Sequence, residues 1–304
     1  MVQIQRILCP VDFYPALERA VDYAVALAKN YEARLTLLHV VAPILPTAYG
    51  VRVDLKSLVE ALKEESARKL QQLSKKAESA DVSVEYIVRT GDIHQEIQRI
   101  VRSAKIDLVV MGTHGRRGVE RWVLGSVAEQ LLRSIKVPLL TIGRTRKHET
   151  APPAIRRILV TTEFSEGTSE AIAYAFSIAQ ECQAQISILH VIGDIGADTS
   201  EEYRDILTKK MGDQLEKLIP DEARVWCDAK TRVETGMPFK VILKVLEKEN
   251  IDLLVMNVHG KRGLDRSLLD STAERVVRAA TSPVLMIPPR APAQRKRRPA
   301  RKVA

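Results

Sequence analysis

The sequence contains little cysteine, few aromatic residues and no long apolar run. Three of its 304 residues are cysteines, and 4% are Phe, Trp or Tyr. Cys9, Cys182 and Cys227 form no CxxC pair and are odd in number, which argues against both a disulfide framework and a thiolate metal site. We expect buried, unreactive thiols. No apolar stretch approaches the roughly 20 residues needed to cross a bilayer, so no membrane partner is expected.

The first residues also lack the features of a secretory signal. The stretch MVQIQRILCPVDF has no basic start, apolar centre or small-residue cleavage site, and it runs directly into a strand-like segment. We therefore expect a cytoplasmic protein. The length corresponds to about two domains of roughly 150 residues each.

Positive charge is concentrated near the carboxyl terminus. The formal net charge is +9, and the stretch APAQRKRRPARKVA at 291–304 holds six Arg or Lys and no acidic residue, so the remaining chain is nearly neutral. Such a segment cannot bury enough apolar area to offset the entropy lost on ordering, so we expect it to be disordered. Two roles stay open for it, a solvated appendage and a contact with polyanions such as nucleic acid.

The chain repeats itself. Three pairs of segments match: 6–40 with 157–191, 106–118 with 251–263, and 137–143 with 282–288. The repeat predicts two copies of one unit. The predicted division is domain 1 at 1–146, a linker at 147–156, where Pro152-Pro153 breaks the periodicity, domain 2 at 157–290, and the basic tail at 291–304.

Each copy alternates short β-branched runs with longer stretches of helical period, which is typical of α/β units around a largely parallel sheet. In the first copy, strands are predicted at 7–11, 34–40, 83–88, 108–111 and 139–142. Four helices are predicted: one opening with Pro15, one from about Leu55 to Ala80, one capped by Asp92 and Gln95 in a capping box, and one beginning near Ser126. His39 and His190 are expected to cap strand ends.

Four glycines lie in the stretch MGTHGRRGVERWVLGSVAEQ (111–130), between a predicted strand and a predicted helix. Ligands of open parallel sheets bind beyond the carboxyl ends of the strands, and a helix N-terminus attracts anions. Glycine lets the backbone approach a phosphate closely, Ser126 adds a hydroxyl donor, and Arg116 and Arg117 add positive charge. The pattern indicates phosphate binding, with a nucleotide as the ligand.

The spacing Gly112-x2-Gly115-x9-Gly125-Ser126 resembles the G-x2-G-x9-G-[ST] signature of the ATP-binding universal stress proteins. The resemblance covers both copies and nearly the whole chain, with the basic tail outside it. It implies two Rossmann-like domains of the adenine nucleotide alpha hydrolase type, each with a five-stranded, largely parallel sheet.

The same resemblance implies roles at the ends of the first two strands. Asp12 would lie near the adenosine, and the backbone of Val40 would face the adenine. The implied ligand is ATP, with or without Mg²⁺, and no other metal. The predicted ATP-binding residues are Pro10, Val11, Asp12, Val40, Met111, Gly112, Gly115, Arg116, Gly125, Ser126 and Val127.

Other phosphate-binding motifs fit poorly. The sequence has no G-x4-GK[ST], which argues against a P-loop ATPase. Gly112, Gly115 and Gly118 are spaced GxxGxxG and follow a late strand, whereas a dinucleotide fingerprint is GxGxxG after the first strand. A receiver domain needs clustered acids after the first strand, and Asp12 stands alone.

The second copy departs from the motif. Asn257 replaces Gly112, Asp270-Ser271 replaces Gly125-Ser126, Glu163 replaces Asp12, and Gly260 matches Gly115. A carboxylate at 270 would repel a phosphate and crowd its approach. We therefore expect domain 2 to be a degenerate partner domain.

These observations predict an ATP-binding stress-response protein in which the nucleotide in domain 1 modulates interactions with unidentified protein partners. The alternatives are a nucleotide-independent scaffold and, more weakly, a polyanion-binding protein acting through its tail. No catalytic constellation is recognisable, although slow ATP hydrolysis or self-phosphorylation at Ser126 stays open. We expect an intramolecular pseudo-dimer through the strands at 139–142 and 284–287, and further homodimerisation stays open.

Deletion of residues 291–304 is expected to weaken any binding to DNA or RNA and to leave thermal stability unchanged. The lost binding should be salt-sensitive and independent of base sequence, because Lys and Arg there would only neutralise phosphates. Filter binding at two salt concentrations measures this. Sequence-selective binding that survives the deletion would place the nucleic-acid contacts elsewhere in the chain.

Overall fold

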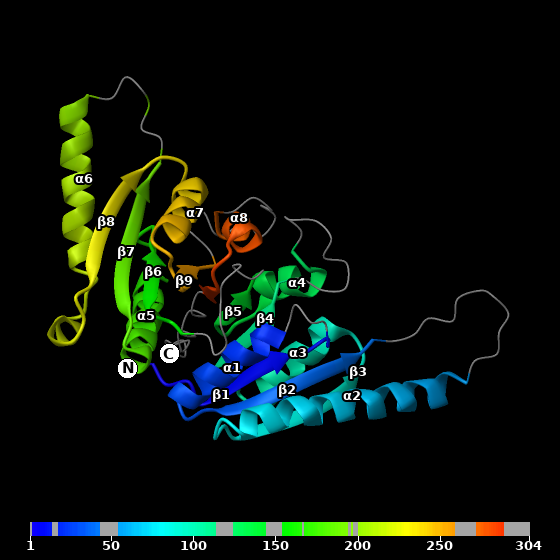
Figure 1. The fold of residues 1–304 in the computed structure, drawn as a ribbon. Coiled ribbons are helices and arrows are strands. Elements are labelled where there is room, and N and C mark those ends of the chain that lie inside the picture. Colours follow the sequence, from blue (N-terminus) through cyan, green and yellow to red (C-terminus); the bar gives the residue numbers. More distant parts are fainter. Residues whose placement is uncertain are drawn as a thin grey trace, which may run out of the picture.

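The computed structural model describes residues 2–13, 18–42, 54–113, 124–143, 154–165, 167–193, 196, 200–258 and 272–288. Within these ranges the chain forms a ten-stranded sheet with helices packed on both faces (Figure 1). None of the helices described there is long and apolar enough to span a membrane.

The strands in chain order are β1 (Arg6–Pro10), β2 (Arg34–Val41), β3 (Val84–Thr90), β4 (Leu108–Gly112), β5 (Leu139–Ile142), β6 (Arg157–Thr161), β7 (Gln185–Ile192), β8 (Lys230–Thr235), β9 (Leu253–Asn257) and β10 (Val284–Ile287). The helices are α1 (Glu18–Asn30), α2 (Leu55–Glu78), α3 (Ile93–Ser103), α4 (Ser126–Ser134), α5 (Thr168–Cys182), α6 (Glu201–Glu216), the 3-10 helix η2 (Asp221–Val225), α7 (Pro238–Lys248) and α8 (Thr272–Ala279).

The sheet order is β3-β2-β1-β4-β5-β10-β9-β6-β7-β8. Each copy supplies five parallel strands in the same relative order, which confirms the predicted α/β class. The predicted strands of the first copy are all present, with ends that differ by at most two residues. Pro15, expected to open the first helix, lies outside the described residues.

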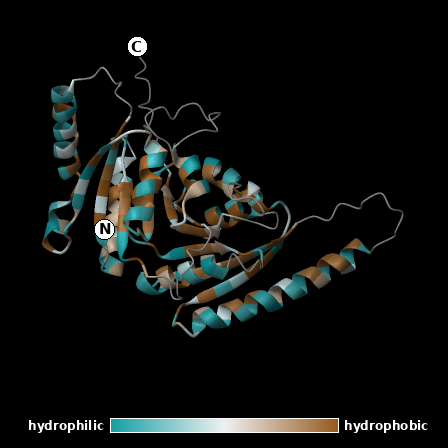
Figure 2. Cartoon of the chain, turned by 45° about the horizontal axis from the view of Figure 1, so that its top comes forward, coloured by the Kyte–Doolittle hydropathy of each residue, from teal (hydrophilic) through white to brown (hydrophobic). Residues whose placement is uncertain are grey.

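Two layers of apolar side chains enclose the sheet. One layer contains residues of α1, α2, α5 and α6, and the other contains residues of α3, α4, α7 and α8. Hydrophobic residues run along the strands between these layers (Figure 2). Burial of this apolar surface is the main favourable term in folding.

The repeat is visible in unusual backbone conformations as well as in the sequence. Three pairs of non-glycine residues with positive φ match across the copies: Phe13 with Phe164, Glu32 with Gln183, and Lys105 with Asn250. Asp107 Oδ2 accepts hydrogen bonds at 2.9 Å from two backbone N–H groups at the start of β1, and Asp252 Oδ2 does the same for β6. Each copy therefore anchors its first strand by the same contact.

The two copies meet at an antiparallel strand pair. β10 pairs with β5, and Leu285 lies opposite Leu140, both with about 1% of their surface exposed. The hydroxyl of Thr141 donates to the carbonyl of Val284 at 3.1 Å. The predicted pairing of the last strands is confirmed.

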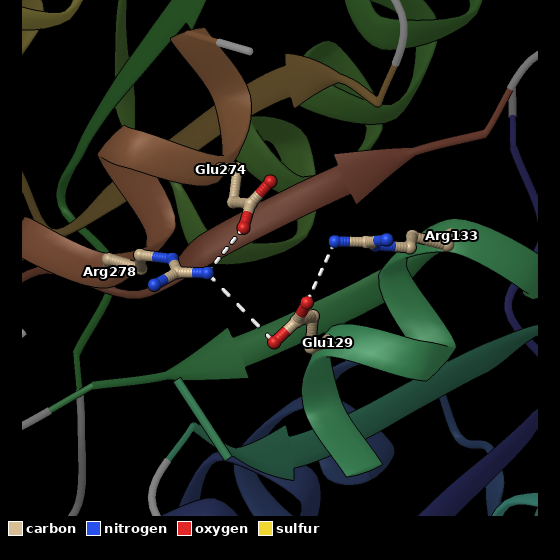
Figure 3. A network of polar contacts seen from close by, with 4 residues as sticks. All are labelled: Glu129, Arg133, Glu274 and Arg278. Carbon is tan, nitrogen blue, oxygen red and sulfur yellow. Dashed lines mark hydrogen bonds and ion pairs between the residues drawn. The ribbon is translucent and has the colours of Figure 1, made fainter. Parts of the chain in front are cut away.

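Contacts on both faces support this strand pair. On one face, the hydroxyls of Tyr31 and Ser177 lie 3.1 Å apart. On the other face, the Glu129 carboxylate binds Arg133 at 2.7 Å and lies 3.9 Å from Arg278 of α8 (Figure 3). A Cβ at Gly143 would lie 2.8 Å from the carbonyl oxygen of Ala280, so the backbones approach closely there.

Leu140→Lys is expected to lower the free energy of unfolding of the full chain by about 3 kcal/mol or more, because it buries an unpaired ammonium group between the copies. Leu58→Lys, at a side chain with 37% exposure on α2, serves as the control and should change stability by less than about 0.5 kcal/mol. Denaturant unfolding measures both. Equal stability of the two variants would contradict the importance of this strand pair.

Candidate functional site

The strand order places a topological switch point in the first copy. β1 lies between β2 and β4, so the chain leaves β1 toward β2 on one side and later returns on the other side as β4. Ligands of open α/β sheets bind in the crevice outside the carboxyl ends of the strands at such a point. The residues after β1 and β4 therefore form the candidate site.

The segment after β1 is held by β2. The backbone N–H of Val11 donates to Leu38 O at 2.8 Å, and Val11 O accepts a hydrogen bond of 2.7 Å from Nδ1 of His39. The ring of Phe13 lies 4.5 Å from the His39 ring. The predicted capping role of His39 is confirmed, and these contacts fix the backbone on both sides of Asp12.

His190 makes the equivalent contact in the second copy. Its Nδ1 donates to Thr162 O at 2.8 Å, and its ring lies 4.8 Å from that of Phe164. Positive φ is uncommon for a bulky residue, so its recurrence at Phe13 and Phe164 marks a conserved turn geometry within the chain.

The backbone of Val40 points past the end of β1. Along a strand, the N–H and C=O groups of residues two apart face the same neighbouring strand. Leu38 faces β1, because its carbonyl accepts from Val11, and its register partner Pro10 is the last residue of that strand. Val40 therefore presents its backbone groups toward the crevice beyond β1.

A hydrogen bond joins the two ends of the segment between β4 and α4. The N–H of Thr113 donates to Ile142 O at 3.0 Å, and the carbonyl of Thr113 accepts from the N–H of Gly125 at 2.7 Å. Gly125 is the N-cap of α4, with ψ 142°, and makes no side-chain cap hydrogen bond. The first turn of α4 thus starts beside the end of β4, at the edge where the crevice lies.

The N-terminus of α4 has the chemistry of an anion site. The first N–H groups of a helix have no intrahelical partner and carry the positive end of the helix dipole. Ser126 is exposed and Val127 is partly buried, so the start of the helix is open to a ligand. Met111 is 7% exposed and belongs to the same apolar cluster as Val40, which supplies a nonpolar wall.

The structure brings nine of the predicted binding residues to this edge. They are Pro10, Val11, Asp12, Val40, Met111, Gly112, Gly125, Ser126 and Val127. Gly115 and Arg116 lie outside the described residues. Their predicted roles stay predictions.

Asn257 occupies the equivalent edge in the second copy. One orientation of its side-chain amide gives hydrogen bonds to both the nitrogen and the oxygen. In it, the nitrogen donates to Gly167 O at 3.1 Å and the oxygen accepts from the N–H of Thr168 at 3.2 Å. This side chain therefore links the end of β9 to the start of α5. Gly112, its counterpart, has no side chain to make such a link.

Hydroxyl groups make further hydrogen bonds in the same region of the second copy. The hydroxyls of Thr162 and Thr168 lie 2.8 Å apart, and Oγ1 of Thr162 accepts from the N–H of Phe164 at 2.9 Å. Thr162 matches Val11, which has no hydroxyl. Asp270, Ser271 and Gly260 lie outside the described residues, so Asn257 and the threonines carry the observed difference between the copies.

The cysteines have the properties of unreactive thiols. Burial raises the pKa of Cys9 to about 12 and also raises the pKa values of Cys182 and Cys227. Because the thiolate is the nucleophile, these shifts disfavour reaction at neutral pH. Cys182 is only partly buried, contrary to expectation, and its Sγ accepts a hydrogen bond from Asn30 at 3.2 Å.

Sequence analysis missed one polar residue near this edge. Glu96, in the first turn of α3, is 7% exposed. The sequence does indicate its burial, because Glu96 lies three residues after Ile93 and four before Ile100, on the apolar side of the helix. Asp92 caps this helix as predicted, accepting from the N–H of Gln95 at 2.9 Å.

Comparison with known proteins gives consistent matches over both copies. The model of the universal stress protein family matches residues 3–143 and 154–288. A universal stress protein of Mycolicibacterium smegmatis is 25% identical over 300 residues, which cover 93% of this chain and 97% of that protein. Universal stress protein MJ0531 of Methanocaldococcus jannaschii is 33% identical over 138 residues, covering 43% of this chain and 81% of that protein.

A solved structure shares the fold over nearly the full length. The crystal structure of a universal stress protein from Archaeoglobus fulgidus superimposes with a TM-score of 0.68 at 24% sequence identity, covering 94% of this chain and 97% of that one. The family match extends over most of the sequence and occurs twice. The chain belongs to the universal stress protein family and is a tandem member of it.

Proposed function

We propose that the first copy binds ATP in the crevice between the ends of β1 and β4, and that occupancy modulates how this stress protein interacts with protein partners. One observation carries the proposal. The hydrogen bond from Gly125 to Thr113, at 2.7 Å, directs the open N-terminus of α4 to the switch point of the sheet. Phosphate groups bind favourably at such a helix end.

The other end of the crevice suits a nucleoside. Val40 offers backbone donor and acceptor groups past the end of β1, and the nonpolar side chain of Met111 belongs to the same apolar cluster. A flat heteroaromatic base uses both kinds of contact. We assign to Asp12, between Val11 and Phe13, a contact with the ligand or with a Mg²⁺ ion that the phosphates also bind.

The proposal assigns binding rather than rapid turnover to this site. Phosphoryl transfer relies on positioned cations and on a group that orients the attacking nucleophile. The sequence has no P-loop lysine.

α4 offers a route from the nucleotide to the second copy. Its first residue, Ser126, lies in the candidate phosphate site, and Glu129 in its first turn lies 3.9 Å from Arg278 of α8. A displacement of α4 on nucleotide binding would therefore alter the contact between the copies. Partners that contact both copies would sense that change.

Gly125→Asp in the full chain is expected to weaken ATP binding between tenfold and a thousandfold. This substitution introduces the residue that the second copy has at 270. A carboxylate about 4 Å from a phosphate costs about 1 kcal/mol in water and several times more in a partly dehydrated site. Calorimetry measures the affinity, and mass spectrometry of nucleotide released from fresh protein reports occupancy. Unchanged affinity would show that the phosphates do not bind at the N-terminus of α4. No adenine nucleotide binding by the unmodified chain would favour a nucleotide-independent scaffold.

The full chain should bind about one ATP, because Asn257 and Asp270 impair the second copy. Asn257→Gly combined with Asp270→Gly is expected to strengthen binding at that copy by at least about tenfold, since the combination removes both the crowding amide and the repelling charge. Titration of this double variant in the Gly125→Asp background isolates the second site. Two equal sites in the unmodified chain would contradict the degeneracy of the second copy.

A further inference from the structure

Glu96 is a buried carboxylate with an unused hydrogen-bonding atom. Its Oε1 pairs with Nη1 of Arg99 at 3.1 Å, and Arg99 is itself 71% exposed. Among the residues that the structure describes, Oε2 of Glu96 has no hydrogen-bond partner. A buried, unpaired carboxylate oxygen is costly and uncommon in native proteins, so its retention needs a reason.

The carboxylate lies at the carboxyl edge of the sheet. Side chains on a helix tilt toward its N-terminus, and α3 starts directly after the end of β3. Gly91, at φ 146°, is so close that a Cβ there would lie 3.5 Å from Cγ of Glu96. The N–H of Gly91 donates to Val41 O at 3.1 Å. Glu96 therefore lies beside the end of β2, next to the residue that follows Val40.

The same side of the sheet carries the nonpolar part of the candidate site. Ile97, which follows Glu96, belongs to one apolar cluster with Val40, Met111 and Leu124. Leu124 immediately precedes the N-cap of α4. The carboxylate and the phosphate-binding helix end thus lie on one face of the sheet, over different strands.

The second copy has the same backbone without the carboxylate. Gly236, at φ 135°, matches Gly91, and a Cβ there would lie 3.4 Å from Cγ2 of Val241. Val241 occupies the position of Glu96 in the repeat. A valine satisfies the packing at this position, so folding of the unit does not require the charge. The carboxylate occurs in the copy whose glycine motif is intact.

We propose that Glu96 is a specificity-determining residue that accepts hydrogen bonds from the ribose hydroxyls of the bound nucleotide. The inference rests on the proposed ATP binding. A carboxylate repels the triphosphate, which α4 attracts, and accepts readily from hydroxyl donors. In dinucleotide-binding sheets an acidic side chain in the corresponding region binds the ribose in this way. The two charges together orient the nucleotide, with its ribose toward β2 and its phosphates toward α4.

The test compares ATP with 2′-deoxy-ATP and 3′-deoxy-ATP by calorimetry on the full chain. The unmodified chain should bind ATP about tenfold or more tightly than at least one deoxy analogue, as expected for loss of a hydrogen bond to a charged acceptor. Glu96→Val, which introduces the residue of the second copy, should bind all three triphosphates with similar, weakened affinity. Glu96→Gln should retain part of the discrimination. Glu247→Gln, at an exposed carboxylate on α7, should behave as the unmodified chain.

Thermal unfolding without nucleotide separates a binding role from a structural one. Glu96→Val should melt at the same temperature as the unmodified chain or a few degrees higher, because it removes an unsatisfied buried oxygen. Retained discrimination in Glu96→Val, a clear loss of its stability, or equal binding of ATP and both deoxy analogues by the unmodified chain would overturn the role of Glu96 and leave ATP binding intact. Failure of the unmodified chain to bind ATP would overturn the proposed function together with this inference.

Discussion

Antiparallel pairing of β5 with β10 turns two five-stranded sheets into one continuous sheet. Without it, each copy would expose the backbone hydrogen-bonding groups of an apolar last strand, an arrangement that promotes association. The pairing also brings α4 beside α8 and α1 beside α5, so that helices of both copies cover each face. The outer edges that remain belong to β3 and β8, and charged residues such as Arg89 and Arg232 occupy them.

The two copies show how one fold supports either an open or a closed crevice. In the first copy, Gly112 and Val11 contribute no polar side-chain atoms to the switch point. In the second, Asn257 and Thr162 connect the neighbouring segments by hydrogen bonds. The second copy thus joins the end of β9 to the start of α5 through its own side chains. Its sheet and packing still provide half of the interface between the copies.

The sequence was informative wherever a residue type has one dominant structural role. The apolar strands β5 and β10 were predicted with their full bounds, and the cap at Asp92 was correct. The range predicted for β3, 83–88, misses both of its observed ends, because only β2 pairs with this edge strand and its side chains are partly exposed. The positive φ of Phe13 could not be predicted from the sequence, since bulky residues rarely adopt this backbone conformation. The partners of Asn257 are distant in the sequence and could not be predicted from it, whereas the burial of Glu96 follows from its helical spacing with Ile93 and Ile100.

A covalent pair of unequal copies has a consequence for how the protein would respond to its ligand. In an assembly of identical chains, a change that closes one crevice closes every crevice, because all sites share one sequence. Here the linkage lets Asn257 bond across the edge of one copy while Gly112 has no side chain at the equivalent edge of the other, and the shared sheet is retained. If only the first copy binds nucleotide, as proposed above, saturation would follow a simple hyperbola rather than a cooperative curve. Such a protein would report nucleotide concentration in graded fashion instead of switching at a threshold.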